Sequence, residues 1–188
     1  MKTKTRKRKR GLQQDKVNFN EGVKLWGGFY RANIHRFAVD YLQLPLFGFQ
    51  MILLYMMNIN NFFYFVASRG LGKSFITSVY CCCRCILYPN TKIIVASGTK
   101  GQARLLISQK IEKELMGMSP NLRREIAYVK VGANDAVVKF KNGSTIEAVA
   151  SSDSARGYRC NILILDECRL ISQHVLNSIK YVAPHQHP

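Results

Sequence analysis

Residues 67–74 read Ala-Ser-Arg-Gly-Leu-Gly-Lys-Ser, and the fold can be inferred outward from this stretch. An aromatic and β-branched run at 62–66 precedes it with the composition of a buried strand, and a helical pattern begins at Phe75. A glycine-rich loop between a strand and a helix is the context in which backbone N–H groups and a helix N-terminus bind nucleotide phosphates. The stretch therefore predicts a phosphate-binding loop, or Walker A motif.

Residues of this loop have distinct predicted roles. Lys73 would neutralise the β- and γ-phosphates of ATP, the Ser74 hydroxyl would be a ligand of Mg²⁺, and Gly70 and Gly72 would let the backbone approach phosphate closely. The loop departs from G-x-x-x-x-G-K-[ST] only at its first residue, which is alanine, and a Gly-Lys-Ser sequence also arises by chance. The predicted ATP-binding residues are Gln50, Ala67, Ser68, Arg69, Gly70, Leu71, Gly72, Lys73 and Ser74.

A second motif is the apolar run 162–165, which ends in Asp166 and Glu167. It is typical of a buried parallel strand, and open α/β sheets bind ligands at the carboxyl ends of such strands. Asp166 would hold Mg²⁺ and Glu167 would polarise the attacking water as general base; two solvated carboxylates at an ordinary strand end are the alternative. Both motifs in this order, as Walker A (67–74) and Walker B (162–167), predict a nucleotide-hydrolysing core.

Two polar residues of the predicted site have open interpretations. Arg69 could contact the γ-phosphate and sense its departure, which would make it catalytic beside Lys73 and Glu167, or it could form a salt bridge on the outer face of the loop. Gln50 lies where its amide could read the adenine edge of a nucleotide, but a glutamine on a helix surface fits the pattern equally well.

The chain of 188 residues is 47% hydrophobic and strongly basic, with a formal charge of +17 from 28 Lys and Arg against 11 Asp and Glu. The length and the lack of a Pro/Gly-rich linker predict one domain over 20–188, preceded by a basic, disordered tail at 1–19. The tail could be a DNA-contacting arm, a nuclear signal or merely a charged tail, and it lacks the features of a secretory signal. The charge favours a polyanionic partner, nucleic acid above all, or an anionic membrane surface.

The hydrophobic patterns along the rest of the chain predict an α/β fold. We expect helices from residue 20 to Pro45, a core helix at 46–57 that is too short to span a membrane, and a helix at 99–118. Strands are expected at 92–97, 126–131, 136–141 and 145–150, the last two joined by a hairpin at Asn142-Gly143. The result is a P-loop fold with a mainly parallel central sheet flanked by helices, plus a β-hairpin elaboration. Four cysteines cluster after the loop: Cys81, Cys82, Cys83 and Cys85. We interpret them as small core residues in a reducing compartment rather than as a zinc site.

Residues 68–74 resemble the variant Walker A motif of large terminase subunits, the DNA-packaging motors of tailed bacteriophages, in which an arginine follows the serine. Residues 96–103 resemble the motif after the second strand of that family, and 156–161 resemble its approach to Walker B. Phe49-Gln50 lies where the family has its adenine-contacting glutamine. The resemblance covers residues 30–183, roughly, and rests on the ordered set of motifs.

This resemblance implies an ATPase that uses Mg²⁺ and assembles as a ring at the capsid portal in the host cell cytoplasm. Its implied partners are double-stranded DNA, a small terminase subunit and the portal or procapsid, with no membrane association. Large terminases carry a nuclease domain after the ATPase domain, and we expect the chain to be C-terminally incomplete, with no DNA cleavage and slow ATP turnover. Paired carboxylates for a nuclease are lacking, because Glu112 and Glu114 face different sides of a helix and Asp166-Glu167 belong to the ATP site.

Lys100, Arg104 and Arg156 are the candidates for DNA contact, together with the basic tail. They offer charges to phosphate without a base-reading motif, so binding should be sequence-independent; a solvated basic surface is the alternative. Two other functions remain open at this stage. A superfamily 2 helicase or another P-loop DNA translocase would share Gln50, Lys73 and Asp166-Glu167 but needs a second RecA-like domain. A non-catalytic nucleic-acid-binding module would need no intact loop.

Overall fold

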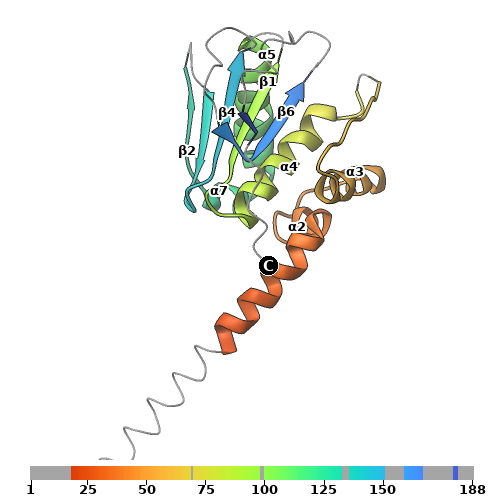
Figure 1. Cartoon of the computed structure of the whole chain (residues 1–188), viewed down its shortest axis with the longest axis vertical. Coiled ribbons are helices and arrows are strands. Elements are labelled where there is room, and N and C mark those ends of the chain that lie inside the picture. Colours follow the sequence, from red (N-terminus) through yellow and green to blue (C-terminus); the bar gives the residue numbers. More distant parts are fainter. Residues whose placement is uncertain are drawn as a thin grey trace, which may run out of the picture.

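The structure, a computed structural model, describes residues 18–68, 70–97, 100–132, 136–150, 159–166 and 180–181. A helix at 18–32 precedes the labelled elements and extends away from the body of the molecule (Figure 1). The helices that follow are α2 (Ile34–Asp40), α3 (Gly48–Ile59), α4 (Lys73–Leu87), α5 (Lys100–Leu105), the π-helix η1 (Leu106–Leu115), α6 (Met116–Met118) and α7 (Pro120–Glu125). The strands are β1 (Lys92–Ser97), β2 (Ile126–Val131), β3 (Ala136–Phe140), β4 (Thr145–Ala150), β5 (Arg159–Cys160), β6 (Ile162–Asp166) and β7 (Lys180–Tyr181).

Five of these strands form a mixed sheet in the order β2-β3-β4-β1-β6. The pairs β4-β1 and β1-β6 are parallel, whereas β3 runs antiparallel to its two neighbours, β2 and β4. Strands β5 and β7 form a separate parallel pair. This arrangement confirms the predicted α/β class, with parallel strands where the Walker B run lies and the hairpin elaboration at the other edge.

One hydrophobic core joins the sheet to the helices that cover it. Helix α4 is buried along most of its length, and its four clustered cysteines are fully enclosed, which confirms their predicted role as core residues. The predicted face of the second long helix is also confirmed, since Leu106, Ile107, Ile111 and Leu115 are all buried. Helices α2 and α3 pack on α4 and on each other. The core therefore holds α4, which begins at the phosphate loop, firmly against the sheet.

The tip of the β3–β4 hairpin is joined to the C-terminal end of α4. The amide nitrogen Nδ2 of Asn142 donates hydrogen bonds to the carbonyl oxygens of Cys85 (2.7 Å) and Ile86 (3.1 Å). The Ser144 hydroxyl donates to the carbonyl of Tyr88 at 3.1 Å. These bonds occupy carbonyl groups that a helix end leaves without an intrahelical partner.

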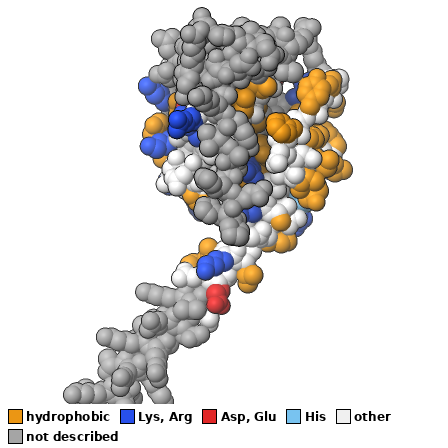
Figure 2. Space-filling model, viewed as in Figure 1, with side chains coloured by type: hydrophobic (Ala, Val, Ile, Leu, Met, Phe, Trp, Pro, Cys, Tyr) orange, Lys and Arg blue, Asp and Glu red, His pale blue; other side chains and the backbone are white. Residues whose placement is uncertain are grey.

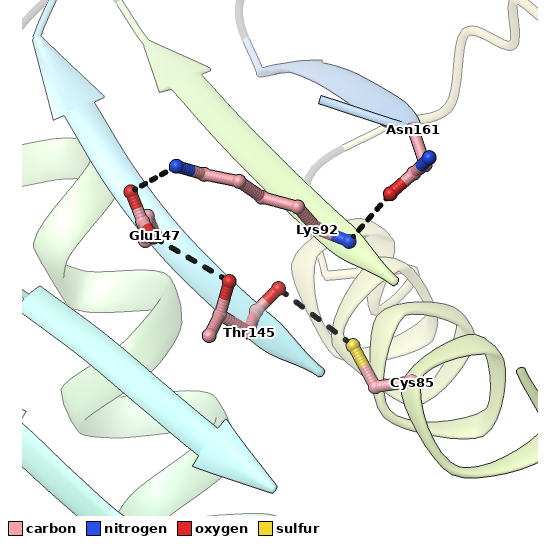
Figure 3. A network of polar contacts seen from close by, with 5 residues as sticks. All are labelled: Cys85, Lys92, Thr145, Glu147 and Asn161. Carbon is pink, nitrogen blue, oxygen red and sulfur yellow. Dashed lines mark hydrogen bonds and ion pairs between the residues drawn. The ribbon is translucent and has the colours of Figure 1, made fainter. Parts of the chain in front are cut away.

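A polar network sets the register of the three parallel strands (Figure 3). The Lys92 backbone N–H donates to Oδ1 of Asn161 at 2.8 Å, and the Asn161 N–H donates to the Lys92 carbonyl, also at 2.8 Å. On the other side of β1, the Lys92 ammonium pairs with Glu147 of β4 at 3.3 Å. With the strand starts fixed in this way, Asp166 at the end of β6 stands opposite Ser97 at the end of β1.

Two sequence-based assignments are wrong. Residues 62–66 form no strand with any described part of the chain; Phe62, Tyr64 and Val66 are 93%, 77% and 79% exposed. Phe63 and Phe65 do pack against the core. Side chains along 62–66 therefore alternate between core and solvent, as in a strand, but the segment does not pair with a described neighbouring strand.

The helix α3 is likewise not a core helix. It buries only Gln50, Leu54 and Met57, because only one of its faces rests on α2 and α4. Its other face exposes Phe49, Ile52, Tyr55, Met56 and Ile59. The preceding helix also ends earlier than predicted, at Asp40, where Gln43 with a φ of 57° turns the chain before Pro45.

A further difference concerns the helix predicted at 99–118. Its middle, Leu106–Leu115, winds as a π-helix between the α-helical segments α5 and α6. Such winding is uncommon and recurs at functional sites. Within the described ranges, no helix combines the length and apolar character that crossing a bilayer requires.

Candidate nucleotide-binding site

The phosphate loop adopts a conformation that requires its two glycines. Gly70 has a φ of +89° and Gly72 a φ of +73°, a left-handed region that side chains with a Cβ disfavour. Gly72 is the N-cap of α4, and its carbonyl accepts the first helical hydrogen bond, from the N–H of Ile76 at 2.9 Å. The free N–H groups at the start of this 15-residue helix therefore open onto the loop.

Lys73 reaches back across the loop. Its Nζ donates hydrogen bonds to the carbonyl oxygens of Ala67 (2.7 Å) and Ser68 (2.9 Å). An ammonium group has three donors, so one is left for a ligand. Lys73 thus ties the two sides of the loop together and keeps one donor for a ligand.

The predicted Mg²⁺ ligands lie at the same end of the molecule. Ser74 is half-buried in the first turn of α4, and its hydroxyl has no hydrogen-bond partner among the described residues. Asp166 is the last residue of β6 and is half-buried beside the fully buried Ser97. Figure 1 shows that α4 begins at the end of the sheet where β1 and β6 finish. The fold therefore brings the two predicted motifs to one edge of the sheet.

Gln50 lies directly beside the loop. It is only 6% exposed, which excludes the alternative of a solvent-facing glutamine on a helix surface. Its Oε1 accepts a hydrogen bond from the N–H of Phe47 at 3.1 Å, and a Cβ placed on Gly72 would stand 3.3 Å from its Nε2. That nitrogen has no partner among the described residues, so its N–H groups can donate to a ligand.

A pocket with a volume of about 450 Å³ is lined by Gln50 and by the two glycines of the loop. It lies between the start of α3, the phosphate loop, the first turn of α4 and the π-helix η1. Its lining residues are Pro45, Phe47, Phe49, Gln50, Gly70, Leu71, Gly72, Phe75, Lys110, Glu114 and Met118.

Several predicted site residues lie outside the described part of the chain: Arg69, Glu167, Arg156 and the basic tail. Lys100 begins α5, but its side chain also lies outside what the structure describes, whereas Arg104 is half-buried in α5. The sequence had suggested no binding role for Lys110 or Glu114, which line the pocket from η1. The only signal was their four-residue spacing, which many ordinary helices share.

Comparison with known families gives one match, over residues 64–180, to the model described as terminase large subunit, T4likevirus-type, N-terminal. A comparison with curated proteins found no match. Among solved structures, the fold is similar to the large terminase ATPase domain of Thermus phage P74-26, with a TM-score of 0.51 and 15% identity over 79% of this chain and 69% of that one. A mutant of that domain aligns with a TM-score of 0.51 and 14% identity, over 79% of this chain and 70% of the other. The large terminase of a thermophilic bacteriophage aligns with a TM-score of 0.43 and 20% identity, over 59% and 26%.

The family model spans well over half of the chain and includes both motifs from which the fold was inferred. The likeness to the Thermus phage domain independently supports the α/β architecture. The chain therefore belongs to the family of terminase large subunit N-terminal domains.

Proposed function

We propose that this chain is the ATP-hydrolysing motor domain of a DNA-packaging large terminase, which couples ATP hydrolysis to translocation of double-stranded DNA into a procapsid. The observation that supports it most is the arrangement at the start of α4. Two glycines with positive φ and the buried Gln50 amide line one pocket, and the Lys73 ammonium lies in the same loop, bonded to the carbonyls of Ala67 and Ser68. This combination suits ATP, which has a polyanionic triphosphate at one end and a flat base with a polar edge at the other.

The donor set at this edge of the sheet fits Mg²⁺, which prefers oxygen ligands. The Ser74 hydroxyl and the Asp166 carboxylate would hold the ion, which would neutralise charge on the phosphate oxygens. Lys73 would bind the β- and γ-phosphates with its remaining donor. Gln50 would donate from Nε2 to the edge of the adenine base.

Hydrolysis needs a base close to the attacking water, and we assign that role to Glu167, the residue after Asp166. Arg69, inside the loop, is proposed to contact the γ-phosphate. A sequence-independent contact with DNA is proposed for Lys100, Arg104, Arg156 and the basic tail. In the assembled motor, the partners would be a small terminase subunit, the portal or procapsid and further copies of the chain in a ring, in the host cell cytoplasm.

The test is an Mg²⁺-dependent ATPase assay on the purified chain, with ATP binding measured in parallel. Lys73→Ala should weaken ATP binding, whereas Glu167→Gln should bind ATP and fail to hydrolyse it. Lys113→Ala is the matched control, because Lys113 is exposed on η1 and does not line the pocket. Parental hydrolysis by Glu167→Gln would refute the base assignment.

The same preparation distinguishes the other candidate functions. A plain nucleic-acid-binding module would bind DNA with no dependence on nucleotide and would tolerate Lys73→Ala, whereas the motor domain would not. DNA binding should weaken steeply between low and moderate salt as counterions are released. We expect no cleavage of plasmid DNA with Mg²⁺ or Mn²⁺; nicking that disappears with Asp166→Ala would mean that these carboxylates serve a nuclease.

A further inference from the structure

The pocket beside the phosphate loop has a charged wall that the proposed ATP site does not yet use. Lys110 and Glu114 of η1 form an ion pair in which Nζ and Oε2 are 2.6 Å apart. Both residues line the same pocket as Gln50 and Gly72. Their neighbours in sequence, Glu112 and Lys113, are exposed and do not line it.

The polarity of the pocket changes from one part to another. Gln50 and Phe75, which both border Gly72, are buried, with 6% and 9% exposed. The side chains of Lys110 and Glu114 are 36% and 31% exposed, so these two charged lining residues are more accessible to water than Gln50 and Phe75. A nucleoside has a matching division, since its base is flat with apolar faces and a polar edge while its ribose carries hydroxyl groups that favour water. A base that contacts Gln50 would therefore place the ribose beside the ion pair of Lys110 and Glu114.

We propose that Glu114 accepts hydrogen bonds from the ribose hydroxyls of the bound nucleotide, and that Lys110 is a positioning residue for this carboxylate. The inference rests on the proposed function, because it takes the ligand to be ATP. A carboxylate has about four lone-pair sites, so Glu114 can keep its ion pair with Lys110 and still accept from two hydroxyls.

Lys110 also has an electrostatic role in this arrangement. A carboxylate without a counterion near a triphosphate would repel it, and the paired ammonium cancels that charge. The pair thus allows an acidic acceptor to lie close to an anionic ligand. The π-helical winding of η1 carries both residues, together with the lining residue Met118 just beyond its end, along one side of the helix toward the pocket.

The experiment compares the dissociation constants of ATP and 2′-deoxy-ATP, measured by calorimetry on the whole chain. The parent should bind ATP about tenfold more tightly, which corresponds to one hydrogen bond to a charged acceptor. Glu114→Ala should bring the ratio close to one, because it removes the acceptor of the 2′-hydroxyl, which ATP alone carries; both nucleotides also lose the contact of the 3′-hydroxyl. Glu112→Ala, on the exposed side of the same helix, should leave the ratio at the parental value.

The role of Lys110 needs its own pair of variants. Lys110→Met should weaken both nucleotides, since it leaves a negative charge near the phosphates, and low salt should enlarge the loss. Lys110→Arg should restore the parental affinities, because it keeps the charge and the donor. If Lys110 only supported the fold, Lys110→Met would have a lower thermal stability but no salt-dependent loss of nucleotide affinity. That outcome would overturn the positioning role.

Equal binding of the two nucleotides by the parent, or an unchanged ratio in Glu114→Ala, would overturn the ribose contact while leaving the ATP site intact. Failure of the parent to bind either nucleotide would instead overturn the proposed function, and the inference with it. Because Glu114 is one-third exposed, its replacement should leave the fold in place, and circular dichroism checks this.

Discussion

The side-chain nitrogen Nε2 of Gln50 lies so close to the backbone of Gly72 that a Cβ on Gly72 would stand 3.3 Å from it. This contact joins the start of α3 to the loop that opens α4, and a side chain at Gly72 would force Gln50 to shift by a few tenths of an ångström. The same residue has a φ of +73°, so conformation and contact both favour glycine there.

The first prediction concerns this position. Gly72→Ala should lower the free energy of unfolding by about 1–2 kcal/mol from the left-handed conformation alone, with a further loss of ATP affinity as Gln50 shifts. Gly70→Ala separates the two effects, since Gly70 also has a positive φ but nothing within 4 Å of its Cβ position. Chemical denaturation measures the stabilities. Gly117→Ala, at an open helical site, is the control and should be neutral or stabilising.

The second prediction concerns base recognition. Gln50→Ala should reduce the preference for ATP over GTP, because the amide would no longer face the edge of the base, and it should weaken ATP binding by about tenfold. Competition binding with the two nucleotides measures both effects. Gln109→Ala, on an exposed position of η1, should change neither. An undiminished preference in Gln50→Ala would place adenine recognition elsewhere.

A third prediction addresses the bond between the hairpin and α4. Asn142→Ala removes the two hydrogen bonds to the carbonyls of Cys85 and Ile86, and it should cost about 1–3 kcal/mol of stability because those half-buried groups lose their partners. Asn60→Ala is the matched control. Its amide also donates to a carbonyl near a helix end, that of Met56, but it is exposed, so water can replace it and the loss should stay below about 0.5 kcal/mol.

The fourth prediction concerns the buried thiols. Burial raises the pKa of Cys81 to about 12 and raises the pKa of Cys82, Cys83 and Cys85 as well, so these groups remain protonated at neutral pH. In a variant with Cys160 and Cys168 replaced by serine, a disulfide reagent at pH 8 should react with none of the four until denaturant is added. Rapid labelling of the folded variant would contradict their burial.

The sign of the pH dependence follows from the same shifts. For an acid whose folded pKa is raised, the unfolded state loses its proton first, at its ordinary value of 9.0. Stability should therefore fall as the pH rises above about 9, and it should be insensitive to these thiols at lower pH. Replacing Cys82 by alanine should remove part of the decrease in stability above about pH 9.

The site could be predicted from sequence where the backbone itself imposes the residue type. Gly70 and Gly72 are required by positive φ, and the apolar run before Asp166 does form a parallel strand beside β1. The prediction that this strand is buried is wrong, because β6 is half-buried along most of its length and Leu165 is 37% exposed. The run at 62–66 was misjudged because aromatic composition does not say whether a neighbouring strand exists to pair with it. Lys110 and Glu114 could not be assigned, since their place in the pocket depends on how η1 packs beside α4.

The attachment of Asn142 to the end of α4 has a mechanical consequence. Helix α4 has 15 residues, and Cys85, to which Asn142 is attached, lies about 18 Å along the helix from Lys73 in its first turn. The helix is bound to the hairpin near its C-terminal end, and it begins in the phosphate loop at its N-terminal end. The hydrogen bonds of Asn142 therefore connect the hairpin edge of the sheet directly to the helix that carries Lys73, in addition to the contacts between α4 and the strands.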